Sequence, residues 1–129
     1  MVKIPNDLKY TKTHEWAKME GDLVYFGITD YAQDQLGTIV HIELPEEEDI
    51  VSKGDAVAIV DSYKASSDVY APVSGRIVKV NRKLEEDPEL LNKDPYGSWI
   101  AAIEPSNPKE WDELLDAEDY AKLLEKEAH

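Results

Sequence analysis

The hydrophobic positions of the chain predict a mainly β protein with helices added to it. Short apolar runs such as LVYFGI at residues 23–28 are typical of buried strands. In residues 38–44, Val40, Ile42 and Leu44 alternate with polar residues, and this period of two predicts a half-buried strand. We expect strands at residues 23–28, 38–44, 56–60, 69–73, 76–80 and 99–103.

Helix-start and helix-end signals stand between these strands. Asp30 as the cap, with Gln33 three residues later, has the spacing that opens a helix, and Gly37 is suited to end it. Further helices are expected to begin at Asp87-Pro88, at Asn107-Pro108 and near Asp116, so a helical segment closes the chain. The 129 residues, 1–129, are expected to form one domain.

Charge and composition narrow the possible partners. The formal net charge is −14, with 28 acidic and 14 basic residues, and such a surface disfavours nucleic acid and anionic membranes. The chain has no cysteine, which excludes disulfides, thiolate metal sites and a cysteine nucleophile. Residues 1–12 lack the hydrophobic core of a signal peptide. We therefore expect a complete soluble protein, acting in a prokaryotic cytoplasm, or in the mitochondrial matrix as a processed form.

Lys64 is the candidate functional residue that the pattern itself isolates. It lies in DSYKASSD, residues 61–68, between two apolar strands, with glycine turns ten residues before it and eleven after. This arrangement predicts that Lys64 stands at the tip of a hairpin, where small neighbours leave its amine open. With an ordinary pKa such an amine is protonated and a poor catalyst, but it is a suitable acceptor for enzymatic acylation.

Residues 61–75, DSYKASSDVYAPVSG, resemble the lipoylation segment of the H proteins of the glycine cleavage system. The chain has Asp61-Ser-Tyr63-Lys64 where that family usually has Glu-Ser-Val-Lys. Further segments that resemble the family are YTKTHEW at 10–16, GITDYAQ at 27–33, QLG at 35–37, DPYG at 94–97 and LLDAEDY at 114–120. The resemblance spans about residues 8–124.

This resemblance implies a fold, a cofactor and a set of partners. The implied fold is a lipoyl/biotinyl-type barrel-sandwich hybrid with short helices, and the implied cofactor is lipoate covalently attached to Lys64. The implied function is non-catalytic carriage of the aminomethyl group of glycine. The partners would be glycine decarboxylase (the P protein), aminomethyltransferase (the T protein) and dihydrolipoamide dehydrogenase (the L protein). A lipoate ligase or a lipoyl/octanoyl transferase would modify the carrier, which is expected to be a monomer.

The resemblance also implies a groove on the carrier that receives the loaded arm. Matching positions place Thr13, Glu15, Gln35 and Asp68 near it. A carboxylate there would hold a cationic nitrogen by a charge-assisted hydrogen bond. For Glu15 and Asp68, surface charge or turn capping is the alternative interpretation.

Other functions for the same residues remain open. A lipoyl-relay protein that donates lipoate to other lipoyl domains would use the same lysine, and an unmodified acidic adaptor would use none. Biotin carriers commonly have methionine on both sides of the lysine, whereas this chain has Tyr63 and Ala65. His14, His41 and His129 suggest no metal triad, and His14 is expected to be a structural residue packed near Trp16.

Overall fold

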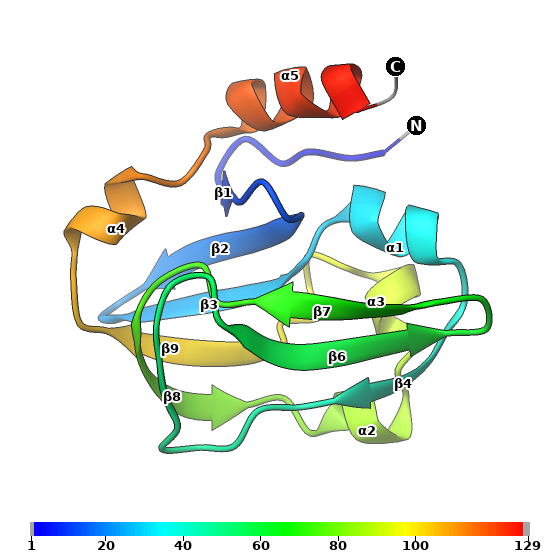
Figure 1. Ribbon diagram of the computed structural model, residues 1–129, viewed down its shortest axis with the longest axis horizontal. Coiled ribbons are helices and arrows are strands. Elements are labelled where there is room, and N and C mark those ends of the chain that lie inside the picture. Colours follow the sequence, from blue (N-terminus) through cyan, green and yellow to red (C-terminus); the bar gives the residue numbers. More distant parts are fainter. Residues whose placement is uncertain (1, 128–129) are drawn as a thin grey trace.

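The computed structural model describes residues 2–127 and contains two antiparallel β-sheets with five short helices around them (Figure 1). The larger sheet runs in the order β1 (Lys9–Tyr10), β2 (Glu15–Glu20), β3 (Leu23–Ile28), β9 (Ala101–Pro105), β8 (Gly75–Val80) and β5 (Ile50–Val51). The smaller sheet runs in the order β4 (Ile39–Glu43), β6 (Ala56–Ser62) and β7 (Ser66–Tyr70). The helices are α1 (Asp30–Leu36), α2 (Lys83–Glu86), α3 (Leu90–Lys93), α4 (Lys109–Asp112) and α5 (Ala117–Glu127). No helix in residues 2–127 is long and apolar enough to cross a bilayer.

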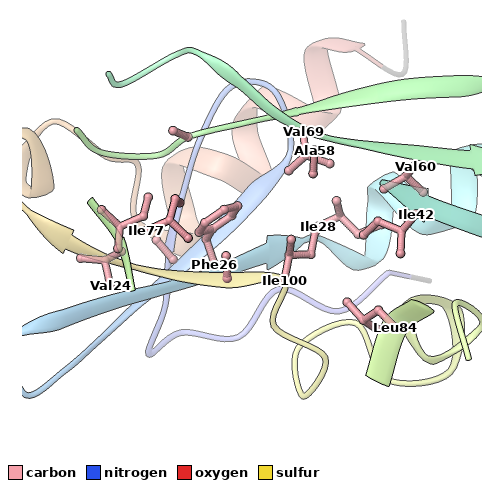
Figure 2. Packing of buried hydrophobic residues seen from close by; sticks show 14 of the residues in the cluster. Val24, Phe26, Ile28, Ile42, Ala58, Val60, Val69, Ile77, Leu84 and Ile100 are labelled. Carbon is pink, nitrogen blue, oxygen red and sulfur yellow. The ribbon is translucent and has the colours of Figure 1, made fainter. Parts of the chain in front are cut away.

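The main hydrophobic core lies between the two sheets. Val24, Phe26 and Ile28 of β3 belong to one buried cluster with Val60 of β6 and Val69 of β7 (Figure 2). Burying a side chain of this kind contributes about 1.5–3 kcal/mol. The smaller sheet, and with it the β6–β7 hairpin, is therefore fixed by apolar packing on one of its faces.

A second buried cluster lies beneath the C-terminal helix. Tyr120 and Leu124 of α5 pack on Leu8, Tyr10 and Trp16. Figure 1 shows α5 lying over the N-terminal segment and β1. This cluster joins the end of the chain to the turn that leads into β2.

The predicted fold class is confirmed, because the protein is mainly β with added helices and a C-terminal helix. The strand predicted at residues 23–28 coincides with β3, and Asp116 does separate the last two helices, with its carboxylate accepting from the Asp119 N–H at 2.8 Å. The strand predicted at 69–73 is displaced by three residues, to 66–70, and the strand predicted at 99–103 is displaced by two, to 101–105. Their bounds follow the backbone pairing with the neighbouring strands.

Two local predictions were wrong. The strand predicted at 38–44 is interrupted by an irregularity between Ile39 and His41, so Ile39 and Ile42 are buried while Val40 is 42% exposed. Thr29, not Asp30, caps α1, because the Thr29 side chain accepts from the Ala32 N–H at 3.2 Å. Asp30 instead lies in the first turn of the helix.

The helical boundaries in the second half of the chain also differ from the prediction. The helix expected at Asp87-Pro88 begins as a turn and becomes α3 only at Leu90. The pattern gave no indication of α2, a single turn whose one buried side chain is Leu84. Such short elements are defined by tertiary packing and carry no period of their own.

Candidate functional site

The β6–β7 hairpin carries Lys64 at its tip, as predicted. Asp61 pairs with Ser66, so only residues 63–65 connect the two strands, and Lys64 is exposed. The Ser62 hydroxyl accepts from the backbone N–H of Lys64 at 3.3 Å and of Ala65 at 3.1 Å. The same side chain closes the turn by donating to the Ala65 carbonyl at 3.2 Å. The sequence therefore builds an ordered tip that presents a free amine.

The tip lies next to the corner between α1 and β4, formed by Gly37 and Thr38 (Figure 1). The Tyr63 N–H donates to the Thr38 carbonyl at 3.3 Å, and Lys64 Cε lies 3.8 Å from the place that a Cβ on Gly37 would occupy. Gly37 has a φ of +78°, a conformation that favours glycine. The aliphatic part of Lys64 thus lies over backbone that carries no side chain.

Asn92 holds this corner in place from α3. Its Nδ2 donates to the Gly37 carbonyl and to Gln33 Oε1, each at 2.9 Å. Its Oδ1 accepts from the Ile39 N–H, also at 2.9 Å. One side chain more than fifty residues away in the sequence therefore ties the end of α1 to the start of β4.

Asp61 is the fixed charge closest in sequence before Lys64. Its carboxylate accepts a hydrogen bond from the Ser66 hydroxyl and lies 3.1 Å from His41 Nδ1. The Ser66 hydrogen bond, followed by that of His41, lowers the pKa of Asp61 below its ordinary value. Tyr63 on the other side of the tip is 83% exposed. The tip therefore combines an open amine, an oriented carboxylate and an exposed aromatic ring.

Glu15 is a buried carboxylate, with only 1% of its surface exposed. Oε1 accepts from the hydroxyls of Thr11 and Thr13, both at 2.5 Å, and Oε2 accepts from the Tyr70 N–H of β7 at 3.2 Å. Burial raises the pKa of Glu15 to about 7, although these three donors oppose the shift. The alternative interpretation of Glu15 as a surface charge was wrong.

The structure brings together two of the four groove residues that the sequence suggested, Glu15 and Thr13. Asp68 is exposed on β7, two residues before Tyr70, and lines a shallow hollow whose other walls include Glu43, Leu44 and Ile59. Gln35 is exposed on α1, two residues before Gly37. Within residues 2–127 neither Asp68 nor Gln35 has a side-chain hydrogen bond to Glu15.

His14 is structural, as predicted, but its neighbours are not those expected. Its ring packs against Tyr31 and Tyr120 and not against Trp16, with ring centroids 4.8 and 5.7 Å away. His14 Nδ1 lies 2.9 Å from the Tyr120 hydroxyl. Tyr120 is 106 residues away, and no local pattern in the sequence indicates that contact.

Of the other two histidines, the structure describes only His41. His41 is exposed and bound to Asp61, and His129 lies outside the described residues. Within residues 2–127 no three His, Asp or Glu side chains are grouped to hold a metal ion.

Comparison with known proteins adds a consistent set of relatives. A family model described as glycine cleavage H-protein matches residues 8–127. The glycine cleavage system H protein of one strain of Thermus thermophilus is 60% identical over 128 residues, covering 98% of this chain and 100% of the relative. That of Carboxydothermus hydrogenoformans is 54% identical over 128 residues, 98% of each chain. The crystal structure of a glycine cleavage system H protein from Mycobacterium marinum has a TM-score of 0.85 at 40% identity, over 92% of this chain and 97% of that one.

Proposed function

The chain belongs to the glycine cleavage H-protein family, whose members are lipoate carriers, and on that premise we propose that Lys64 is the residue that bears the lipoyl group. The observation that carries the proposal is the position of Lys64 at the ordered tip of the β6–β7 hairpin. The lysine is exposed, and Ala65, Ser66 and Ser67 after it are small. An enzyme that acylates the amine therefore has access to it without disturbing the core.

The residues around Lys64 are suited to a long covalent arm. Amide formation removes the charge of the amine, and the arm leaves the protein over the bare backbone of Gly37. When bound, the lipoyl group supplies a pair of sulfur atoms for disulfide–dithiol chemistry, which this cysteine-free chain does not contain. The chain itself contributes attachment and orientation, so its role in this proposal is non-catalytic.

Glu15 is the group that we assign to holding the cargo. A carboxylate with a pKa near 7 exchanges its proton readily at neutral pH, and it binds a cationic amine strongly in a site from which water is largely excluded. Thr11 and Thr13 fix the orientation of this carboxylate through their hydroxyls. We propose Thr13 as part of the same site, because its hydroxyl donates to the Glu15 carboxylate. Gln35 and Asp68 stay proposed groove residues, although within residues 2–127 neither makes a hydrogen bond to Glu15.

The finer function that follows is transport of the aminomethyl group of glycine between three enzymes. These are glycine decarboxylase, aminomethyltransferase and dihydrolipoamide dehydrogenase, and the carrier meets them in the cytoplasm as a single-domain monomer. The net charge of −14 favours transient encounters with basic docking surfaces. A tethered arm also raises the effective concentration of the cargo at each active site.

Mass spectrometry of the protein produced together with a lipoate ligase and lipoate tests the attachment. We expect a lipoyl-sized increment on the peptide that contains Lys64 and its complete loss in Lys64→Arg. Lys18→Arg is the matched control, because Lys18 is another exposed lysine, with 47% of its side chain exposed, but it lies within a strand and not at a hairpin tip, so this variant should keep the increment. An unmodified wild-type protein with several ligases would overturn the assignment. Glycine–carbon dioxide exchange with glycine decarboxylase then separates the carrier from a lipoyl relay, which would not support exchange.

A further inference from the structure

His14 has a backbone conformation that needs support. Its φ is +73°, in the left-handed region that an L-residue with a side chain rarely adopts. A single residue held there costs of order 1–3 kcal/mol, and it persists only where its surroundings fix it. His14 lies between the two groove residues Thr13 and Glu15, so this conformation sets the direction in which Glu15 leaves the turn.

The C-terminal helix α5 provides that support. The Tyr120 hydroxyl lies 2.9 Å from His14 Nδ1, and Glu127 Oε2 lies 3.0 Å from His14 Nε2. The Tyr120 hydroxyl is also 2.7 Å from Thr29 Oγ1, and the Thr29 N–H donates to the His14 carbonyl at 3.0 Å. Both ring nitrogens and the carbonyl of His14 are therefore held.

One proton arrangement satisfies all of these contacts. Burial lowers the pKa of His14 despite the opposing effect of Glu127, and this favours the neutral ring. The ring then donates from Nε2 to Glu127 and accepts at Nδ1 from the Tyr120 hydroxyl, which in turn accepts from Thr29. Burial raises the pKa of Tyr120, which keeps its hydroxyl a donor.

The turn itself connects His14 to the carboxylate of Glu15. The His14 N–H donates to the Thr11 carbonyl at 3.2 Å, and the Thr11 N–H donates to the Glu15 carbonyl at 3.0 Å. The Glu15 N–H donates to the Thr11 hydroxyl at 3.0 Å, and this hydroxyl also donates to the Glu15 carboxylate. A change of φ at His14 would therefore rotate Glu15 relative to all of its donors.

We infer that α5 is the positioning element of the buried carboxylate: through Tyr120 and Glu127 it holds His14 in the left-handed conformation and thereby orients Glu15. The inference rests on the proposed function only for the role of Glu15 in holding the cargo. The geometry concerns the unmodified chain, so it is tested without lipoate. A helix that merely covers the N-terminal segment would stabilise the protein without controlling Glu15 specifically.

The test compares Tyr120→Phe with Tyr10→Phe. The two rings stack on each other with centroids 4.6 Å apart, both are fully buried, and each substitution removes one hydroxyl. The Tyr10 hydroxyl donates to the Pro5 carbonyl at 2.6 Å, outside the His14 network. The pKa of Glu15 is measured by 13C NMR of its carboxyl carbon in folded, unmodified protein. We expect a fall of about one pKa unit in Tyr120→Phe, as the turn loosens and water reaches the carboxylate, and no change in Tyr10→Phe.

Two substitutions at position 14 provide a rescue experiment. His14→Ala and His14→Gly both remove the imidazole, but only glycine adopts a positive φ without penalty. We expect His14→Ala to lower the pKa of Glu15 and His14→Gly to leave it near its wild-type value. The double variant Tyr120→Phe with His14→Gly should also restore that value.

An unchanged pKa of Glu15 in Tyr120→Phe, or equal shifts in Tyr120→Phe and Tyr10→Phe, would overturn the inference. Equal effects of alanine and glycine at position 14 would do the same. Failure of Lys64 to accept lipoate would change none of these measurements, so the two proposals fail separately.

Discussion

Lys64 and Glu15 show how burial assigns different roles to two charged residues. Lys64 is exposed at a tip, where it is available for modification. Glu15 is buried among donors that keep its carboxylate oriented, and its pKa is raised to about 7 by burial. The first residue is suited to covalent attachment and the second to reversible binding of a cation.

The raised pKa of Glu15 predicts how stability depends on pH. The folded protein binds this proton more tightly than the unfolded chain, whose carboxyl has a pKa near 4.5. The associated stability is therefore complete below about pH 4.5 and is lost as the pH rises through about 7, a change of about 3 kcal/mol. Glu15→Gln cannot titrate, so urea unfolding at pH 5 and pH 8 should show a smaller loss than in the wild type.

Glu20→Gln is the matched control for this measurement, because Glu20 ends the same strand and is exposed. It should keep the pH dependence of the wild type. His14 changes the stability in the opposite direction, because its lowered pKa adds stability as the pH rises towards 6.5. Glu15→Gln and Glu20→Gln both retain His14, so its contribution cancels in the comparison. Equal pH dependence in Glu15→Gln and wild type would contradict a carboxyl group that titrates near neutrality.

At the scale of elements, the β6–β7 hairpin has strands that are fixed by the core and a tip that is exposed. Its inward side chains, including Val60 and Val69, belong to the core, and its tip projects to Gly37. Ser62 completes the arrangement because one hydroxyl satisfies the backbone donors of Lys64 and Ala65. The hairpin thus presents Lys64 from a fixed position.

Ser62→Ala should loosen the tip without unfolding the hairpin. Loss of the hydroxyl leaves the N–H groups of Lys64 and Ala65 to water, which costs about 1 kcal/mol locally. Hydrogen exchange of these two amides should become roughly fivefold faster, while the global free energy of unfolding changes little. Ser67→Ala is the control, since the Ser67 hydroxyl makes only a 3.3 Å contact with the Asp68 carbonyl. An equal effect of both substitutions on the tip would argue against the role of Ser62.

The position of Lys64 at a hairpin tip and the bounds of β3 were predicted correctly from the sequence, for a physical reason. Strands with a continuous apolar run, such as β3, and turns with small residues around Lys64 are local properties, and they were predicted. The phase of β4 was not, because an irregularity after Ile39 reverses the alternation. The donors to Glu15 from β7 and the contact of His14 with Tyr120 come from distant segments, and no local pattern contains them.

At the scale of the whole molecule, two packed clusters carry the two halves of the candidate site. The core between the sheets fixes the hairpin with Lys64, and the cluster under α5 fixes the turn with Glu15. The Tyr70 N–H bond to Glu15 joins them. A change in either cluster is therefore expected to alter the position of the lysine relative to the carboxylate.

The net charge of −14 supplies the prediction at this scale. Like charges repel one another more in the folded protein than in the expanded chain, and salt screens this repulsion. Raising NaCl from about 0.1 to about 1 M shortens the screening length from about 10 Å to about 3 Å. The free energy of unfolding should then rise by about 1 kcal/mol, the size of two or three unfavourable surface contacts.

The surface ion pairs predict that added salt lowers the free energy of unfolding, whereas the acidic excess predicts that salt raises it. The salt measurement therefore distinguishes the two effects. Arg76 contacts Glu48 at 2.8 Å and Glu104 at 3.3 Å, and screening would weaken both pairs. Many exposed pairs of this kind contribute nothing measurable to stability, so the acidic excess should dominate the salt dependence. Glu46→Gln, which removes one charge from the acidic turn at residues 46–49, should reduce the salt dependence. Stability that falls with salt would show that the ion pairs around Arg76, and not the acidic excess, determine the electrostatics of the folded protein.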